Sequence, residues 1–327
     1  MKNNMLTKGF AILCAVVLLC VAGMTLLPLA HAEQYRVGDA EISANLKELK
    51  VNWTSGAVHI AYHTGNTVVI SEKTTGMITE DMRMRWRLEG DTLTVEYEQP
   101  GFHLFSLFPH EKELTVTLPE GLTLDKAYIS ATSADLDIPA LYADSVNLHA
   151  TSGDVRAKVS AQVIKGKLTS GDMDLQVTSA VKEIKLESTS GKITLESAWN
   201  AEKIVIDATS GDIQAAIKQT GEFKAGSTSG NIHAVLGSAR KAEIECTSGK
   251  VTLEIGGIEE LKVHTTSGNI NAYLPEAQGF TAKIETTSGD FAYNLPLSKD
   301  GKSYIAGDGS AKVEIYTTSG DVKLSAK

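Results

Sequence analysis

The sequence predicts an all-β protein, a parallel β-solenoid or β-helix of about ten rungs of about 19 residues with an irregular N-terminal β cap. The first observation behind this prediction is a Thr-Ser-Gly tripeptide that recurs nine times between residues 151 and 320. The second is an alternation of apolar and polar residues on both sides of each copy. The third is composition: aromatic residues make up only 6% of the chain, while Thr, Ser, Gly and Val recur, which favours short strands and tight turns.

The spacing of the tripeptide sets the length of the repeat. Successive copies lie 18 to 21 residues apart, apart from a last step of 31 residues, and a degenerate Thr132-Ser133-Ala134 precedes the first copy by 19. The copies begin at Thr151, Thr169, Thr189, Thr209, Thr228, Thr247, Thr266, Thr287 and Thr318. Because one unit of this size cannot bury its own apolar face, the units are expected to stack in parallel, with right-handed coiling by analogy with parallel crossovers.

The residue columns show which side chains face inward when the Thr of each copy is numbered zero. Positions −5, −3, +4, +6 and +8 contain 45 residues, and all are apolar except Gly166 and Ser197. The alternate positions −4, −2, +5 and +7 contain 36 residues, of which six are apolar: Val205, Ala216, Val235, Tyr273, Ala292 and Tyr316. This period of two predicts strands with one buried face before and after each corner.

The corners themselves are expected to need glycine and small neighbours. A glycine permits a positive φ, and position −1 mostly holds small or hydroxyl residues that we expect to bond to corner backbone groups. The corner glycines are Gly153, Gly171, Gly191, Gly211, Gly230, Gly249, Gly268, Gly289 and Gly320.

Three segments follow from these patterns. Residues 1–32 read as a signal peptide or, if they are not cleaved, an N-terminal membrane anchor: two lysines precede an apolar run that ends at Ala30-His31-Ala32. Residues 33–129 are expected to form the β cap and opening rungs, including one corner at Thr54-Ser55-Gly56. Residues 130–327 form the repeat solenoid, and the strand before Thr318 is expected to lead into its last rung.

An apolar loop interrupts the cap at residues 102–108. Two interpretations remain open: the loop folds over the open end of the core, or it is an exposed contact for a membrane or partner. Its apolar residues are Phe102, Leu104, Phe105, Leu107 and Phe108.

No catalytic, cofactor or metal site is predicted. The residues that follow the corner glycines include acids, but Lys192 and Lys250 share their column, which does not suit a row of calcium sites. Acids on the outward face alternate with lysines, no nucleophile–His–acid or metal-ligand spacing is visible, and a carbohydrate-active enzyme is therefore the weakest alternative. A net charge of −9 without a basic stretch to meet the phosphates argues against a nucleic-acid partner, and none is expected.

One outward face carries the candidate ligand-binding strip. Planar polar groups and an aromatic ring fall at positions +5 and +7 of consecutive repeats, a mixture that suits sugars, although an ordinary wetted sheet face explains it too. The strip consists of Gln214, His233, Thr252, Asn271 and Tyr273.

With its corner motif, the chain resembles the "putative adhesin" family of bacterial surface proteins, an uncharacterised-domain family of Thr-Ser-Gly-repeat β-solenoids. The resemblance runs from about Leu46 to Lys327 and includes the run from Leu49 to Gly56, the run from Leu114 to Pro119, and the closing Thr318-Ser319-Gly320-Asp321. It implies an extracytoplasmic, adhesin-like scaffold, and relatives linked to cell-envelope stress. It supplies no catalytic residues.

The expected function is therefore that of a non-enzymatic, secreted or cell-envelope-associated bacterial scaffold. Its expected partner is a cell-envelope glycan or surface protein, with membrane contact only through an uncleaved N-terminal segment. The alternative is a cell-envelope stress sensor or regulator that acts through a protein partner.

Overall fold

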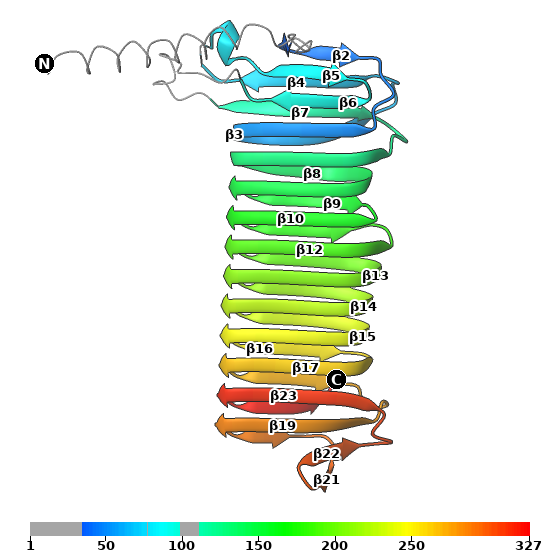
Figure 1. Ribbon diagram of the computed structural model, residues 1–327, viewed down its shortest axis with the longest axis vertical. Coiled ribbons are helices and arrows are strands. Elements are labelled where there is room, and N and C mark those ends of the chain that lie inside the picture. Colours follow the sequence, from blue (N-terminus) through cyan, green and yellow to red (C-terminus); the bar gives the residue numbers. More distant parts are fainter. Residues whose placement is uncertain (1–34, 77, 99–110) are drawn as a thin grey trace, which may run out of the picture. The chain divides into compact units, whose positions relative to one another are not determined.

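The computed structural model describes residues 35–76, 78–98 and 111–327, and residues 36–327 form a stack of β rungs (Figure 1). Nearly all regular structure is strand, and the pairings between repeats are parallel and in register. The predicted parallel β-solenoid is therefore confirmed. In the part of the chain that the structure describes, no helix is long and apolar enough to cross a membrane.

The repeats form the middle of the stack, where one strand often runs through the bend between two corners. Ile204 pairs with Ile184 on one side and with Phe223 on the other, so the apolar columns lie in continuous inward rows. Ile206, Ile213 and Ile232 are fully buried, as the column pattern predicts. The strands of this region are β8 (Leu124–Ser152), β9 (Val155–Ser160), β10 (Val163–Ser170), β11 (Met173–Val177), β12 (Val181–Ser190), β13 (Ile193–Ser210), β14 (Ile213–Ser229), β15 (Ile232–Ser248), β16 (Val251–Ile255), β17 (Ile258–Ser267) and β18 (Ile270–Leu274).

The corner glycines are required mainly because successive corners touch. A Cβ on Gly211 would lie 1.9 Å from the carbonyl oxygen of Gly191, and one on Gly191 would lie 1.9 Å from that of Gly171. Gly171 has a φ of +109° and Gly191 one of +126°, whereas Gly211 is not among the positive-φ residues. The expected freedom of φ thus explains some corners, and the close approach of backbones explains the others.

Most of the polar residues at position −1 bond to the corners as expected, the exception being Thr317, whose buried Oγ1 has no partner among the described residues. Ser188 Oγ donates to the carbonyl of Gly191 at 3.4 Å, and Ser227 Oγ donates to that of Gly211 at the same distance. Thr265 Oγ1 donates to Gly268 O at 3.3 Å. These bonds lie within one corner or join one rung to the next, and they hold the bend without large side chains.

At the N-terminal end the order of rungs in space differs from their order in the chain. β3 (Glu48–His63) pairs in parallel with β8 on one side and with β6 (Thr92–Glu96) and β7 (Lys112–Pro119) on the other. The first complete rung of the chain thus lies second in the stack, and Ser55 of its corner pairs with Ser133. The cap is completed by β1 (Arg36–Val37), β2 (Ala40–Ile42), β4 (Val68–Thr74), the 3-10 helix η1 (Glu80–Met82) and β5 (Arg85–Glu89), whose strands pair antiparallel.

A buried ion pair joins the strands of this cap. Lys112 Nζ lies 2.7 Å from Glu72 Oε1, and both side chains are almost completely buried. The ammonium also donates to the carbonyls of Met82 and Tyr97, while the Glu72 carboxylate accepts the backbone N–H of Met84. Burial lowers the pKa of Lys112, and the hydrogen bond that its ammonium donates to Glu72 opposes that shift. The pair is saturated with partners, which is what allows two charges to lie in the core.

The C-terminal end corrects the expectation that the Thr318 repeat is the last rung of the stack. β23 (Ala311–Ser319) pairs with β17 on one side and with β19 (Phe280–Ser288) on the other. β24 (Val322–Ala326) likewise lies between β18 and β20 (Phe291–Tyr293). The chain therefore lays down the outermost rung first, turns through β21 (Ser298–Asp300) and β22 (Ser303–Ala306), and then inserts its final rung one place inward (Figure 1).

Candidate functional site

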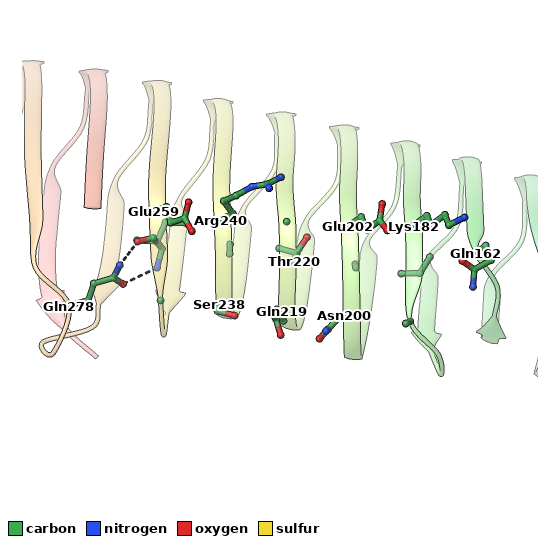
Figure 2. Close-up of a pocket in the computed structure, with 17 residues that line it drawn as sticks. Gln162, Lys182, Asn200, Glu202, Gln219, Thr220, Ser238, Arg240, Glu259 and Gln278 are labelled. Atoms are coloured by element: carbon green, nitrogen blue, oxygen red, sulfur yellow. Dashed lines mark hydrogen bonds between the residues drawn. The ribbon is translucent and has the colours of Figure 1, made fainter. Parts of the chain in front are cut away.

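A groove runs across successive rungs at the bend opposite the Thr-Ser-Gly corners. It has a volume of about 820 Å³ and extends from Gln162, just before β10, to Gln278, just before β19. Figure 2 shows its residues side by side on neighbouring rungs, so it follows the long axis of the stack. Rung spacing in a β-sheet is about 4.8 Å, which gives the groove a regular repeat along its length.

The middle of the groove floor consists of small inward side chains, and Val181 and Ile258 continue the same row toward its ends. Ala201, Thr220 and Ala239 pair in register on adjacent strands, and all three are at most 5% exposed. Thr220 Oγ1 donates to the carbonyl oxygen of Glu222 at 3.0 Å, so the one hydroxyl among these three is satisfied within its own bend. Small side chains at this bend leave the space that larger ones would fill.

One rim carries uncharged polar groups. Asn200 pairs with Gln219, and Gln219 pairs with Ser238, so three hydrogen-bonding side chains follow one another on consecutive rungs (Figure 2). Asn200 and Gln219 are exposed. Each amide offers both a donor and an acceptor, which suits a ligand that carries many hydroxyl groups.

The other rim alternates in charge. Lys182, Glu202, Arg240 and Glu259 line it in that order, with Gly221 opening a gap in the middle (Figure 2). Two positive and two negative groups cancel, so the groove has no net charge on this side. A strongly anionic polymer gains little from such a rim, whereas a neutral polar polymer meets donors and acceptors in alternation.

The far end of the groove is closed by the side chain of Gln278, whose amide makes hydrogen bonds that a neighbouring strand would otherwise make. Gln278 Oε1 accepts the backbone N–H of Ile258 at 2.9 Å, and Gln278 Nε2 donates to the carbonyl oxygen of Ile258. Since β23 pairs with β17 only from Glu260 onward, the amide supplies the partner that Ile258 would otherwise lack on that side. This closure depends on the inserted C-terminal rung.

The strip predicted from the sequence is assembled, but on a different face from the groove. Gln214 pairs with His233, His233 with Thr252, and Thr252 with Asn271, so four of its residues form one continuous row. Tyr273 lies in the neighbouring row, opposite Glu254. His233 Nε2 lies 3.4 Å from Glu254 Oε1, which gives one member of the strip a local partner. The ligand-binding role of the strip stays a prediction.

The acidic column after the corner glycines has a structural role that the sequence analysis missed. Asp172 Oδ1 accepts the backbone N–H of Lys192 at 2.8 Å, and Asp154 Oδ1 accepts that of Asp172 at 3.0 Å. Asp212 and Asn231 repeat the bond to the next rung. These oxygens are therefore engaged in bonds between rungs, which explains the preference for Asp and Asn in the column without any ion.

A second hollow lies beside the Thr-Ser-Gly corners, between the position −2 column and the corner threonines. Its acids include Glu187, Asp207 and Glu245. Burial and the neighbouring Glu187 carboxylate raise the pKa of Asp207, whereas a hydrogen bond from Lys185 lowers that of Glu187. Over the described ranges, no cluster of three or more His, Cys, Asp or Glu side chains is arranged to hold a metal ion.

The apolar loop at residues 102–108 lies outside the described residues. The structure places its flanks: β6 ends at Glu96 and β7 begins at Lys112, where the neighbouring rung has its Thr54-Ser55-Gly56 corner.

The groove between Gln162 and Gln278 was not predicted, because the sequence analysis treated the bend between repeats as a variable turn. A signal was present, since Asn200, Gln219 and Ser238 recur 19 residues apart, next to small residues. The 19-residue period is visible in the sequence. The depth of the groove is not, because it depends on which side chains turn inward at the bend.

The comparison with known proteins gave a match to one protein family over most of the chain. The model of the Toastrack DUF4097 family matches residues 47–255 and, in a second overlapping match, residues 167–325. No curated protein is similar enough to this chain to count as a match.

Three of the solved structures that match the chain come from bacteria. "A putative cell adhesion protein" from Clostridium sporogenes is 14% identical, with a TM-score of 0.23, and the alignment covers 90% of this chain and 100% of that one. "A putative adhesin" from Bacteroides fragilis is 11% identical, with a TM-score of 0.35 and coverages of 90% and 98%. A "putative lipid binding protein" from Parabacteroides distasonis is 14% identical, with a TM-score of 0.36 and coverages of 89% and 97%. At these TM-scores the three structures carry no conclusion about function.

Proposed function

Because the chain belongs to the Toastrack DUF4097 family and carries a neutral polar groove along its stack, we propose that it is a non-enzymatic extracytoplasmic scaffold that binds an extended, neutral glycan of the cell envelope. The groove between Gln162 and Gln278 is the observation that carries this proposal. The leader-like residues 1–32 motivate the extracytoplasmic location.

The geometry favours a linear ligand with hydroxyl groups at a regular interval. The groove repeats its polar groups once per rung, about 4.8 Å apart. An extended peptide places side chains on one face every two residues, about 6.6 to 6.8 Å apart, and would fall out of step with the rungs. In a chain of linked six-membered sugar rings, each ring is roughly as long as the spacing between rungs. Successive rings can therefore lie beside Asn200, Gln219 and Ser238 in turn.

The charges favour a neutral glycan over an anionic one. The alternating rim from Lys182 to Glu259 sums to zero, and the chain as a whole has a formal charge of −9. Anionic polymers would therefore be repelled at long range and would gain no compensating positive patch in the groove.

The test is binding to a glycan array and to purified cell-wall fractions. We expect the unmodified chain to bind neutral linear glycans. The double variant Asn200→Ala/Gln219→Ala should lose about 5- to 150-fold in affinity, because each lost hydrogen bond contributes about 0.5–1.5 kcal/mol. The control Ser190→Ala/Ser210→Ala removes two exposed hydroxyls from the opposite corners and should bind normally. An array without any glycan above background would overturn the proposal.

The second function, a cell-envelope stress sensor with a protein partner, is motivated by the family resemblance and by the loop at residues 102–108. That loop lies outside the described residues, so this function stays a prediction.

A further inference from the structure

The repeat that begins at Thr189 departs from the pattern in one core residue and in its length, the latter shared with the preceding repeat. Ser197 is one of only two residues that break the inward apolar columns, and the step from this repeat to the next is 20 residues rather than 19. The register confirms an irregularity here: Ser197 pairs with Ile217 and Asn200 pairs with Gln219, so Ala198 and Trp199 lie opposite the single residue Lys218. The extra residue forms a β-bulge.

The bulge is held in place by the serine. Ser197 is 3% exposed, its Oγ donates to the carbonyl oxygen of Trp199 at 3.0 Å, and the backbone N–H of Trp199 donates back to that Oγ at 3.3 Å. One buried hydroxyl thus satisfies both backbone groups of Trp199. This arrangement explains why a polar residue occupies a core column, since the bulge frees two backbone groups that need a partner.

The bulge directs a tryptophan outward. Trp199 is 52% exposed, whereas the other two tryptophans of the chain, Trp53 and Trp86, are 2% and 5% exposed. An indole that exposes half of its surface has given up burial that is worth kilocalories per mole for a large aromatic side chain. The sequence has therefore built a bulge whose structural effect is to place a flat apolar ring at the surface.

The ring borders a small hollow of about 600 Å³. Ala216 and Val235 lie on its floor, and they are two of the six apolar residues in the outward columns of the repeats. They pair with each other in register, next to Glu196, and Lys218 and Gln176 complete the polar border. Two of the six exceptions to the outward polar pattern thus meet beside the one exposed tryptophan.

The mixture of surfaces suits one sugar ring. A pyranose has an apolar face of C–H groups and a polar edge of hydroxyls, which match an aromatic face with an apolar floor and a border of amide, carboxylate and ammonium groups. The apolar side chains of the lining that are not buried are only four, Ala198, Trp199, Ala216 and Val235. They offer far less than the roughly 800 Å² per partner that a stable protein interface buries. The charged Glu196 and Lys218 beside it do not suit insertion into a membrane.

The hollow also continues the groove. Trp199 borders the hollow, and Asn200, the next residue, stands on the uncharged rim of the groove. The bulge therefore separates the two spaces by a single residue, and a ligand in the groove reaches the indole by branching or bending at Asn200.

We propose that Trp199 is a stacking platform for one sugar ring of a glycan held in the groove. This subsite rests on the proposed function, because the groove supplies the remainder of the binding. Ala216 and Val235 form the apolar floor of the subsite, and Ser197 acts as a positioning residue for the indole.

The experiment uses the intrinsic fluorescence of the full chain titrated with neutral hexasaccharides of glucose and of N-acetylglucosamine. Trp199 is the one exposed tryptophan of the three, so binding should shift its emission to shorter wavelength and protect it from acrylamide quenching. Both variants lack this reporter, so the affinities of all chains are compared by isothermal titration calorimetry. We expect Trp199→Ala to weaken binding about tenfold and Trp199→Phe, which keeps a flat ring, to weaken it less than about threefold. Circular dichroism melting curves check that both variants fold.

The outcomes separate this subsite from the groove. If Asn200→Ala/Gln219→Ala abolishes binding while Trp199→Ala binds as tightly as the unmodified chain, the groove stands and the Trp199 subsite is overturned. Binding without any change in quenching likewise overturns it. If neither hexasaccharide binds the unmodified chain, both the subsite and the groove proposal are wrong.

Discussion

At the scale of single residues, the corner repeats because several small requirements coincide there. Glycine is needed where a Cβ would collide with the previous corner, as at Gly211, and the small residues at position −1 bond to corner carbonyls. The residue after the glycine is preferably Asp or Asn because its side-chain oxygen accepts the N–H of the same position one rung on. The inward columns could be predicted from period two alone. This ladder could not, because each of its bonds joins a side-chain oxygen to a backbone N–H about 19 positions further along the chain.

The ladder predicts a stabilising substitution at Lys192. The Lys192 side chain has no oxygen that could accept the backbone N–H of Asp212 on the next rung. The row of hydrogen bonds is therefore interrupted between Lys192 and Asp212. Replacing Lys192 by Asn supplies that oxygen without adding a negative charge between Asp172 and Asp212. We expect the free energy of unfolding to rise by about 0.5–1.5 kcal/mol in urea denaturation.

The matched control is Lys192→Ala, which removes the lysine but supplies no acceptor. If the Asn variant is no more stable than the Ala variant, the ladder does not contribute to stability in the way the geometry indicates.

At the scale of elements, both ends of the stack place a rung out of chain order. β3 lies inside the rung of β6 and β7, and β23 with β24 lies inside the rung of β19 and β20. An inserted rung has partners on both sides and cannot fray from the end, and the outer rung is tied to it by the chain on either side. The sequence shows the 31-residue step before Thr318 but not where the strand goes, because every repeat carries the same columns and fits any position in the stack.

This rung order predicts which corners can be joined by a disulfide. Ser267 pairs with Ser319, and Ser319 pairs with Ser288, so Ser267 and Ser288 lie two rungs apart. Neighbouring rungs, about 4.8 Å apart, fall in the 4.4–6.8 Å range of Cα separations that a disulfide spans, and two rungs exceed it. We expect Ser267→Cys/Ser319→Cys to oxidise readily, as detected by peptide mapping without reduction.

The paired control is Ser267→Cys/Ser288→Cys, which should remain reduced under the same conditions. The opposite pattern would mean that the repeats stack in chain order and that the insertion is wrong.

At the scale of the whole molecule, the architecture follows from repetition, whereas the proposed function follows from departures from it. We could predict the solenoid, its inward columns and its corners because the same pattern recurs in nine copies of one motif, so a deviation in one copy does not hide it. The groove at the opposite bend could not, since its floor depends on which of three adjacent residues in a short turn faces inward. Ser197, Ala216 and Val235 were visible as exceptions in the columns, but only the register brings them together with Trp199.

The most direct test of the groove is carboxyl footprinting with and without a bound neutral glycan. Glu202 and Glu259 stand on the charged rim, while Asp207 and Glu245 are exposed on the opposite side, beside the Thr-Ser-Gly corners. With a saturating glycan, carbodiimide labelling followed by mass spectrometry should decrease at Glu202 and Glu259 and stay unchanged at Asp207 and Glu245. Protection of Asp207 and Glu245 with unchanged labelling at Glu202 and Glu259 would contradict the account.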